Sequence, residues 1–245
     1  MDTYSTIIIG GGPAGLFCAA HAASRSGRVL LLEKNAVCGK KLLITGSGMC
    51  NITHAGSISE FFTRYGDHGS FVRPTLRSFT NDDLTAYFNS RGQPLVTAEG
   101  GKVFPGSYRS ADVLAVLLDE CRKNNVEIHC AEPVVHVKQS EGSFVVTTEE
   151  RSYRSSHLVI ATGGASYPAT GSTGDGYRLA GELGHTITRI APALTGIIPF
   201  NYPFADLAGI SFEKSRISVH RSGKKIKDCL LYTSPSPRDR TRSRM

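Results

Sequence analysis

Residues 6–15 read TIIIGGGPAG and carry the strongest signal for the fold. The β-branched run 6–9 is typical of a short strand buried in a parallel sheet. It leads directly into glycines at the spacing G-x-G-x-x-G. An Ala-rich stretch, residues 16–26, then predicts a helix that stops at Gly27. The next apolar run, residues 28–33, predicts a second buried strand. Strand, glycine turn, helix and strand in this order predict a βαβ unit that binds a dinucleotide.

The glycine turn and the start of the helix have separate tasks in such a unit. Gly10 allows the tight turn, Gly12 lets the backbone approach a pyrophosphate, and Gly15 lets helix and strand pack closely. Pro13 and Ala14 stand in the first helical turn, where free N–H groups and the helix dipole attract phosphate. We therefore expect these residues to hold the phosphates of the ligand.

Glu33 ends the second predicted strand, at about the 20-residue distance where an acidic residue hydrogen-bonds a ribose. A carboxylate there favours an unphosphorylated ribose, as in FAD or NAD, and disfavours NADP. The glycines alone do not choose between FAD and NAD.

The segment that follows, residues 35–51, reads NAVCGKKLLITGSGMCN. Its glycines permit unusual φ angles and close backbone approach. Lys40 and Lys41 lie just beyond the second strand, either beside a pyrophosphate or flavin edge or on a solvated loop. Cys50 is either close to a flavin or a small buried thiol.

The rest of the chain alternates helix and strand patterns. Helices are predicted over 82–91, over 111–123 with Ser110 as the cap, and over 177–183, and residues 104–107 predict a turn. Asp175, just before the last helix, is either an N-cap or first-turn acid or a ligand contact. Residues 126–160 change to short strands at 126–129, 134–137, 143–148 and 156–160, the last one ending in ATGG. An antiparallel meander that returns to such a strand favours a flavin-dependent fold over a simple dehydrogenase.

Composition excludes several classes of protein. The chain is 40% hydrophobic and contains no apolar stretch long enough to span a bilayer, so no membrane partner is expected. The net charge is +7, but part of it lies in arginines after residue 237 and the rest is scattered, so we expect no nucleic-acid partner. The cysteines show no zinc spacing, and the start of the chain lacks the basic region of a signal peptide. We expect reduced thiols, no metal and a cytoplasmic location.

Residues 39–53, GKKLLITGSGMCNIT, resemble the signature G-R/K-K-L-x-x-S/T-G-x-G-x-C-N-x-T of a family of bacterial FAD-dependent flavoproteins. That family is usually labelled aminoacetone oxidase-like, with a branch labelled bile-acid dehydro-reductase, and its members are NAD(P)-linked. Further blocks that agree are 103–107, 161–168, 170–177 and 192–194. The resemblance spans roughly residues 4–228.

The resemblance implies an extended FAD, with NAD(P)H as a candidate electron donor and a small-molecule substrate. Lys40, Lys41 and the loop 46–51 would follow the phosphates and isoalloxazine, and Val134 would meet the adenine through its backbone. Residues 161–164 would close over the dinucleotide. The full set of predicted cofactor-binding residues is Gly10, Gly12, Pro13, Ala14, Gly15, Glu33, Lys34, Gly39, Lys40, Lys41, Gly46, Ser47, Gly48, Cys50, Asn51, Val134, Ala161, Thr162, Gly163 and Gly164.

We therefore predict an α/β fold in which residues 1–191 form the first part of a discontinuous, Rossmann-type FAD-binding domain. Its parallel sheet carries an antiparallel β-meander crossover. Residues 192–228 would begin an inserted, mainly β substrate domain that is truncated here. Residues 229–239 back-translate, with suitable codons, to a transposase sequencing adapter, so 229–245 is expected to be a non-native tail.

The predicted function is that of an FAD-dependent oxidoreductase that transfers hydride between an organic substrate or NAD(P)H and flavin. One alternative is an FAD-dependent tRNA-modifying flavoprotein, and another is a truncated flavin-binding remnant without turnover. No catalytic acid or base and no oligomeric state is assigned.

Overall fold

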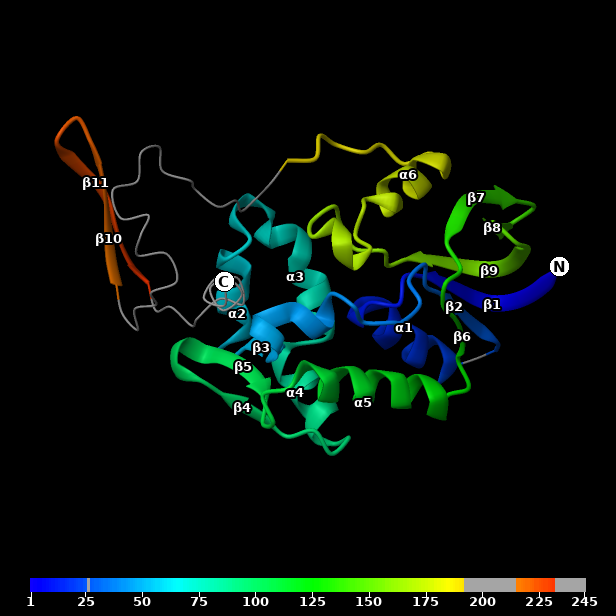
Figure 1. Cartoon of the computed structure of the whole chain (residues 1–245), viewed down its shortest axis with the longest axis horizontal. Helices are drawn as coiled ribbons and strands as arrows, with labels where there is room; N and C mark the ends of the chain where they lie inside the picture. Colours follow the sequence, from blue (N-terminus) through cyan, green and yellow to red (C-terminus); the bar gives the residue numbers. More distant parts are fainter. Residues whose placement is uncertain (26, 192–214, 232–245) are drawn as a thin grey trace, which may run out of the picture. The chain divides into compact units, whose positions relative to one another are not determined.

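The computed structural model describes residues 1–25, 27–191 and 215–231 (Figure 1). Its contacts divide the chain into two units, Met1–Thr188 and Arg189–Met245. Each unit is described by itself below.

The first unit is built on a six-stranded sheet with the order β6-β2-β1-β9-β8-β7. Strand β1 (Asp2–Ile9) pairs in parallel with β2 (Val29–Leu32) on one side and with β9 (Ser152–Ile160) on the other. Strand β6 (Glu127–His129) continues the parallel part beside β2. The βαβ unit predicted from residues 6–33 is confirmed.

The other side of the sheet is the antiparallel meander predicted from the strand patterns. Strand β7 (Val134–Ser140) pairs with β8 (Ser143–Thr148), and β8 pairs with β9. The chain thus leaves the parallel part after β6 and returns to β1 through β9. The predicted Rossmann-type fold with a meander crossover is confirmed.

Helices α1 (Pro13–Ala23) and α5 (Ser110–Lys123) lie against one face of the parallel strands (Figure 1). Alternate side chains of β1 pack on the two opposite faces of the sheet. Ile8 packs into the core cluster with α1 and α5, whereas Ile7 and Ile9 pack with the meander and Leu179 of α6 (Asp175–Glu182). Because both faces are covered, the central strands have continuous apolar runs.

Residues 53–105 add elements that the sequence patterns did not predict. Strands β3 (Thr53–His54), β5 (Lys102–Pro105) and β4 (Leu95–Thr97) form a small antiparallel sheet. The region also contains α2 (Ile58–Thr63), α3 (Gly69–Ser78) and the predicted helix α4 (Asn81–Asn89). Helices α2 and α3 have few buried residues, so no broad apolar stripe marks them in the sequence. Short 3₁₀ segments cover Leu42–Gly48 (η1), Gly66–His68 (η2), Glu99–Gly101 (η3) and Pro168–Thr170 (η4).

Two local predictions differ from the structure. Ser110 does not cap α5: it is the first residue of the helix, and its hydroxyl donates to the Leu43 carbonyl oxygen at 3.0 Å. The hydroxyl therefore joins the helix to η1. The turn predicted at 104–107 begins later, because Phe104 and Pro105 still belong to β5.

The described part of the second unit is a hairpin of β10 (Ser215–Arg221) and β11 (Lys224–Leu231). The predicted start of the inserted domain, residues 192–228, contains β10 and the first part of β11, whereas its residues 192–214 lie outside the described residues. Of the predicted tail 229–245, residues 229–231 continue β11 and the remainder is also outside the described part.

Candidate dinucleotide-binding site

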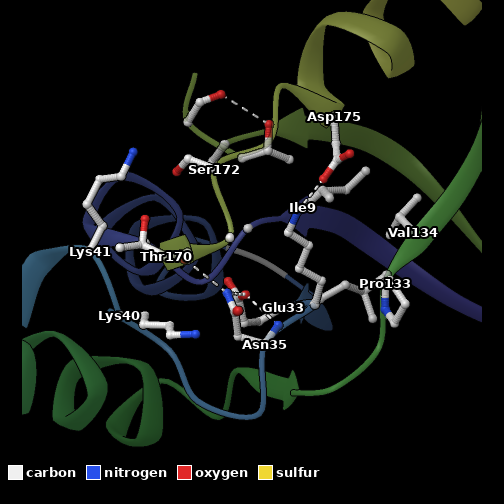
Figure 2. Close-up of a pocket in the computed structure, with 18 of the residues that line it drawn as sticks. Ile9, Glu33, Asn35, Lys40, Lys41, Pro133, Val134, Thr170, Ser172 and Asp175 are labelled. Atoms are coloured by element: carbon white, nitrogen blue, oxygen red, sulfur yellow. Dashed lines mark hydrogen bonds and ion pairs between the residues drawn. The ribbon is translucent and has the colours of Figure 1, made fainter. Parts of the chain in front are cut away.

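A cavity of about 580 Å³ lies at the carboxyl ends of β1, β2 and β9 (Figure 2). Open α/β sheets bind their ligands at this edge, where neighbouring strands connect in opposite directions. The predicted residues that line it are Gly10, Gly12, Pro13, Ala14, Glu33, Lys34, Gly39, Lys40, Lys41, Val134, Ala161, Thr162 and Gly163.

Two of the glycines are required by the fold itself. Gly10 has φ +110°, and a Cβ built on it would lie 2.5 Å from the Ala161 carbonyl oxygen of the neighbouring strand's end. A Cβ on Gly15 would overlap the Gly10 carbonyl oxygen. These glycines therefore allow the tight turn and the close packing of α1 on β1.

Gly12 differs, because nothing in the protein requires a glycine there. Its φ of −76° and ψ of 178° suit any residue, and a Cβ built on it would meet no atom within 4 Å. The open space belongs to the cavity. A side chain at this position would occupy the path by which a ligand reaches the backbone.

Helix α1 begins at this point with its N-terminus open to the cavity. Gly12 offers no capping side chain, Pro13 is the first helical residue, and the first turn contains no acidic residue. The helix dipole is thus not neutralised by the chain itself. An anionic group such as a pyrophosphate fits this end of the helix.

Glu33 is buried at the end of β2 and already has several partners. Its Oε2 accepts from the Gly11 N–H at 2.6 Å, and its Oε1 accepts from the Asn35 backbone N–H and Nδ2 at 2.7 and 2.6 Å. A carboxylate has about four lone-pair sites, so one remains for a ribose hydroxyl. The sequence indicated the ribose role but not the bond to the glycine turn.

The lysines of the cavity differ in what they contact. Lys34 Nζ is bound by Asp175 at 2.5 Å and by Thr173 Oγ1 at 2.6 Å, and Lys41 Nζ donates to the Ser166 carbonyl oxygen at 2.7 Å. Lys40 has no hydrogen bond or ion pair within the described ranges 1–25, 27–191 and 215–231. Figure 2 shows Lys40 and Lys41 on one side of the cavity, opposite Pro133 and Val134.

Asp175 has the first-turn position in α6 that the sequence predicted. Burial tends to raise the pKa of its carboxyl, but the hydrogen bonds from Lys34 and Thr173 outweigh burial and lower it. The Lys34–Asp175 pair joins the end of β2 to the first turn of α6. It therefore closes one side of the cavity.

The wall opposite Lys40 and Lys41 comes from the connection between β6 and β7 (Figure 2). Glu132 accepts from the Tyr153 and Thr148 hydroxyls at 2.6 and 3.1 Å and lies 3.0 Å from His129 Nδ1. Burial tends to raise the pKa of Glu132, but these bonds outweigh it and lower the pKa. An Arg178 guanidinium N–H donates to the Val135 carbonyl oxygen at 2.6 Å, which holds α6 to the same wall.

Residues 46–51 of the family signature do not line this cavity, whereas Gly39, Lys40 and Lys41 at the start of the signature do. The predicted residues that do not line it are Gly15, Gly46, Ser47, Gly48, Cys50, Asn51 and Gly164. Gly46, Ser47 and Cys50 have φ values between 53° and 60°, so the loop 45–50 has an unusual backbone. Cys50 is a buried thiol of the core, and burial raises its pKa. Contact of this loop with a flavin ring stays a prediction.

Several lining residues were not selected from the sequence. They are Ile9, Leu32, Asn35, Glu132, Pro133, Val135, Thr170, Gly171, Ser172, Asp175, Arg178 and Leu179. The Gly-rich run 171–176 was a usable signal, and Asn35 stands two residues after Glu33. Glu132 and Arg178 have no local signature and reach the cavity only through the meander and α6.

Within the part of the chain that the structure describes, no group of three or more metal-binding side chains occurs, and no helix is long and apolar enough to cross a bilayer.

A mainly parallel sheet with this glycine turn, an open helix N-terminus and an acidic residue after β2 defines a Rossmann-type dinucleotide-binding protein. Residues 4–226 match the model of the HI0933-like protein Rossmann domain. The chain belongs to this family, and the family resemblance inferred from residues 39–53 is confirmed.

Curated relatives include proteins of two different names. The chain is 34% identical over 205 residues to a 3-dehydro-bile acid delta(4,6)-reductase of Clostridium scindens, covering 83% of this chain and 49% of that protein. It is 30% identical to ribosomal RNA dihydrouridine synthases of Escherichia coli and Haemophilus influenzae, covering 95% of this chain and 58% and 59% of those proteins.

The chain spans about half the length of the curated relatives it matches. The names of the second group do not support the expectation that the protein has no nucleic-acid partner. They also do not assign such a partner to this chain.

Proposed function

We propose that the protein is an FAD-dependent oxidoreductase that saturates a ring carbon–carbon double bond, with NAD(P)H as electron donor. A delta(4,6)-reductase and a dihydrouridine synthase are both named for adding hydrogen to a ring double bond, although their substrates differ. Membership of the family and the meander β7–β9 favour FAD over NAD as the resident dinucleotide. We retain the prediction of a cytoplasmic location.

The observation that carries the proposal is the open space at Gly12. A glycine that neither its backbone angles nor its neighbours require is explained by a ligand that approaches the main chain. The pyrophosphate would lie between Gly12 and the N-terminus of α1. Lys40, which has no partner among the described residues, would supply a cation to the phosphates.

The adenosine would occupy the other end of the cavity. Glu33 would accept from a ribose hydroxyl with its remaining lone pair, and the Val134 backbone would meet the adenine. Bound flavin supplies hydride transfer, while the protein binds, orients and shields it. Among the described residues we assign no proton donor to the substrate.

One feature supports an RNA base as a second candidate substrate beside a free small molecule. A cleft of about 400 Å³ lies along α2 and α3 and contains Arg73 and Arg77. Their guanidinium carbons lie 5.1 and 5.6 Å from the centre of the Phe62 ring, and neither arginine forms an ion pair within the described residues. Such unpaired cations beside an aromatic ring suit a phosphate backbone.

The test uses the whole protein. The purified protein should show the visible spectrum of a flavin, which NADH or NADPH should bleach without oxygen. A cyclic enone should restore the oxidised flavin spectrum and be converted to the saturated ketone. The saturated analogue of the enone should not restore the spectrum. Protein that purifies without flavin and binds none would overturn the cofactor, and flavin that no enone or uracil reoxidises would overturn the reaction.

RNA and small-molecule substrates are separated by a second comparison. If uracil in RNA is the substrate, unmodified ribosomal RNA should reoxidise the flavin and gain dihydrouridine. Replacing Arg73 and Arg77 with glutamate should then raise KM for RNA at least tenfold and leave the enone reaction unchanged. Equal KM values for the variant and the wild type would remove the α2–α3 cleft from substrate binding.

A further inference from the structure

Two cysteines are in contact next to residues that line the cavity, and the proposed function assigns them no role. Cys38 Sγ and Cys130 Sγ lie 3.8 Å apart, although 92 positions separate the residues in the chain. Cys38 is 7% exposed, whereas Cys130 is exposed to solvent, and both are free thiols. One sulfur is therefore accessible and its neighbour is shielded.

The backbone already holds the two cysteine-bearing segments together. The Glu33 N–H donates to the His129 carbonyl oxygen at 2.8 Å, and the Ala131 N–H donates to the Asn35 carbonyl oxygen at the same distance. A third bond runs from the Glu132 N–H to the Glu33 carbonyl oxygen at 3.0 Å. These bonds involve residues before and after Cys130. The backbone pairing at the ends of β2 and β6 therefore holds the two thiols in contact.

Ala131 completes this arrangement with a φ of 57°, a left-handed conformation that is uncommon for a residue with a side chain. The turn follows Cys130 directly and is held by the bond to Asn35. The two sulfur atoms of a disulfide lie about 2.0 Å apart. Rotation of the two neighbouring side chains brings the sulfur atoms closer without separating the segments.

We infer that Cys38 and Cys130 form a redox-active dithiol that undergoes exchange with small-molecule disulfides. The Cys130 thiolate attacks one sulfur of the small disulfide, forms a mixed disulfide and releases one thiol. The Cys38 thiolate then attacks Cys130 Sγ and releases the second thiol. The protein loses two electrons and two protons, and the small disulfide is reduced to two thiols.

The order of the two steps follows from the surroundings of the sulfurs. Burial raises the pKa of the Cys38 thiol, and the neighbouring Cys130 raises it further. Exposure makes Cys130 the sulfur that an outside disulfide can reach. Cys38 thus acts second, when the mixed disulfide already lies beside it.

The dithiol is in contact with the glycine turn. A Cβ built on Gly11 would lie 2.5 Å from Cys38 Sγ, and the Gly39 N–H donates to the Gly11 carbonyl oxygen at 2.9 Å. A Cys38–Cys130 disulfide would link the loop after β2 to the loop after β6, which form the adenosine end of the cavity. We expect the disulfide to slow the release of FAD, an expectation that rests on the proposed function.

The experiment treats the intact native protein with oxidised glutathione, blocks remaining thiols and maps peptides without reduction. We expect one linked pair that contains Cys38 and Cys130 and disappears with dithiothreitol. C38S and C130S should lack the pair, and C38S should stop at glutathione on Cys130. C18S is the matched control, because Cys18 is a half-buried thiol elsewhere in the structure, and should retain the pair.

Wild-type protein that carries only glutathione, or links other cysteines, would overturn the dithiol. Release of FAD is then timed by fluorescence in the oxidised and reduced forms. We expect at least threefold slower release from the oxidised wild type and no difference in C130S. Equal rates in a protein with the verified disulfide would overturn its effect on the cofactor. A protein without FAD would overturn the proposed function alone, because peptide mapping does not need the cofactor.

Discussion

Glu33 Oε2 accepts a hydrogen bond from the Gly11 N–H at 2.6 Å, which joins the end of β2 to the turn after β1. The acceptor is a buried carboxylate, so the bond belongs to the stronger, charge-assisted kind. A residue that the motif associates with the ribose therefore also holds the glycine turn in place. Cofactor binding and the local fold are coupled at this residue.

Replacing Glu33 with glutamine should lower both stability and FAD affinity. The amide keeps the size of the side chain, but its NH₂ group must face a donor, either the Gly11 N–H or Asn35. A buried donor left without an acceptor costs about 1–3 kcal/mol. Urea unfolding without cofactor measures the stability term, and FAD titration measures the affinity.

Glu149→Gln is the matched control, because Glu149 is exposed on the turn between β8 and β9. It should change neither quantity. If E33Q unfolds at the same urea concentration as the wild type, the bond to Gly11 does not stabilise the turn.

Gly12→Val should abolish FAD binding and leave the protein folded. Its Cβ would meet no protein atom, so the new side chain would fill the space that we assign to the pyrophosphate. Loss of the flavin spectrum with an unchanged unfolding midpoint is the expected result. Gly181→Ala, at a glycine of α6 whose added Cβ would also meet no atom but which lies outside the cavity, should retain the flavin.

Gly15→Val provides the opposite comparison, because its side chain would overlap the Gly10 carbonyl oxygen. This variant should unfold more easily. A G12V protein that purifies with a normal flavin spectrum would remove the pyrophosphate from this position.

Lys40→Ala should weaken FAD binding by about fivefold, which corresponds to roughly 1 kcal/mol for one exposed contact between an ammonium and a phosphate. The loss should be smaller at high salt, because ions screen exposed charges. Lys102→Ala, an exposed lysine of β5, serves as the control. Equal FAD dissociation constants for K40A and K102A would contradict the role of Lys40.

Stability should fall as the pH drops below the ordinary range of Asp and Glu carboxyls, about 4. The pKa values of Glu132 and Asp175 are lowered in the folded protein. A lowered folded pKa adds stability above the unfolded pKa, and this stability is lost as the pH falls through the folded pKa.

The free energy of unfolding, measured from pH 7 to pH 3, should therefore decline below about pH 4.5. Glu132→Gln should make the decline shallower, because one proton fewer is taken up on unfolding. A decline as steep as that of the wild type would show that Glu132 is not held in its charged form by Tyr153, Thr148 and His129.

The βαβ start, the meander and the family could all be predicted from local sequence patterns. Residues 6–33 carry apolar runs, glycines and an acidic residue at fixed spacings, and each of these signals acts over a few neighbouring positions. Gly10 and Gly15 could be assigned to the turn and to close packing because a βαβ unit places them in the same way in any protein. The helices α2 and α3 were missed because most of their residues face solvent.

Contacts between groups that are distant in the chain follow from the tertiary fold and could not be predicted from local patterns. The sequence placed Glu33 near a ribose, but its bond to Gly11 requires the parallel pairing of β1 with β2. Lys34 was predicted among the cofactor-binding residues, and the structure adds that Asp175 holds it, because α6 lies beside the end of β2. Cys38 and Cys130 become neighbours because β2 pairs in parallel with β6. Local patterns determine elements, whereas such contacts depend on strand order and register, which arise when both faces of the sheet are buried.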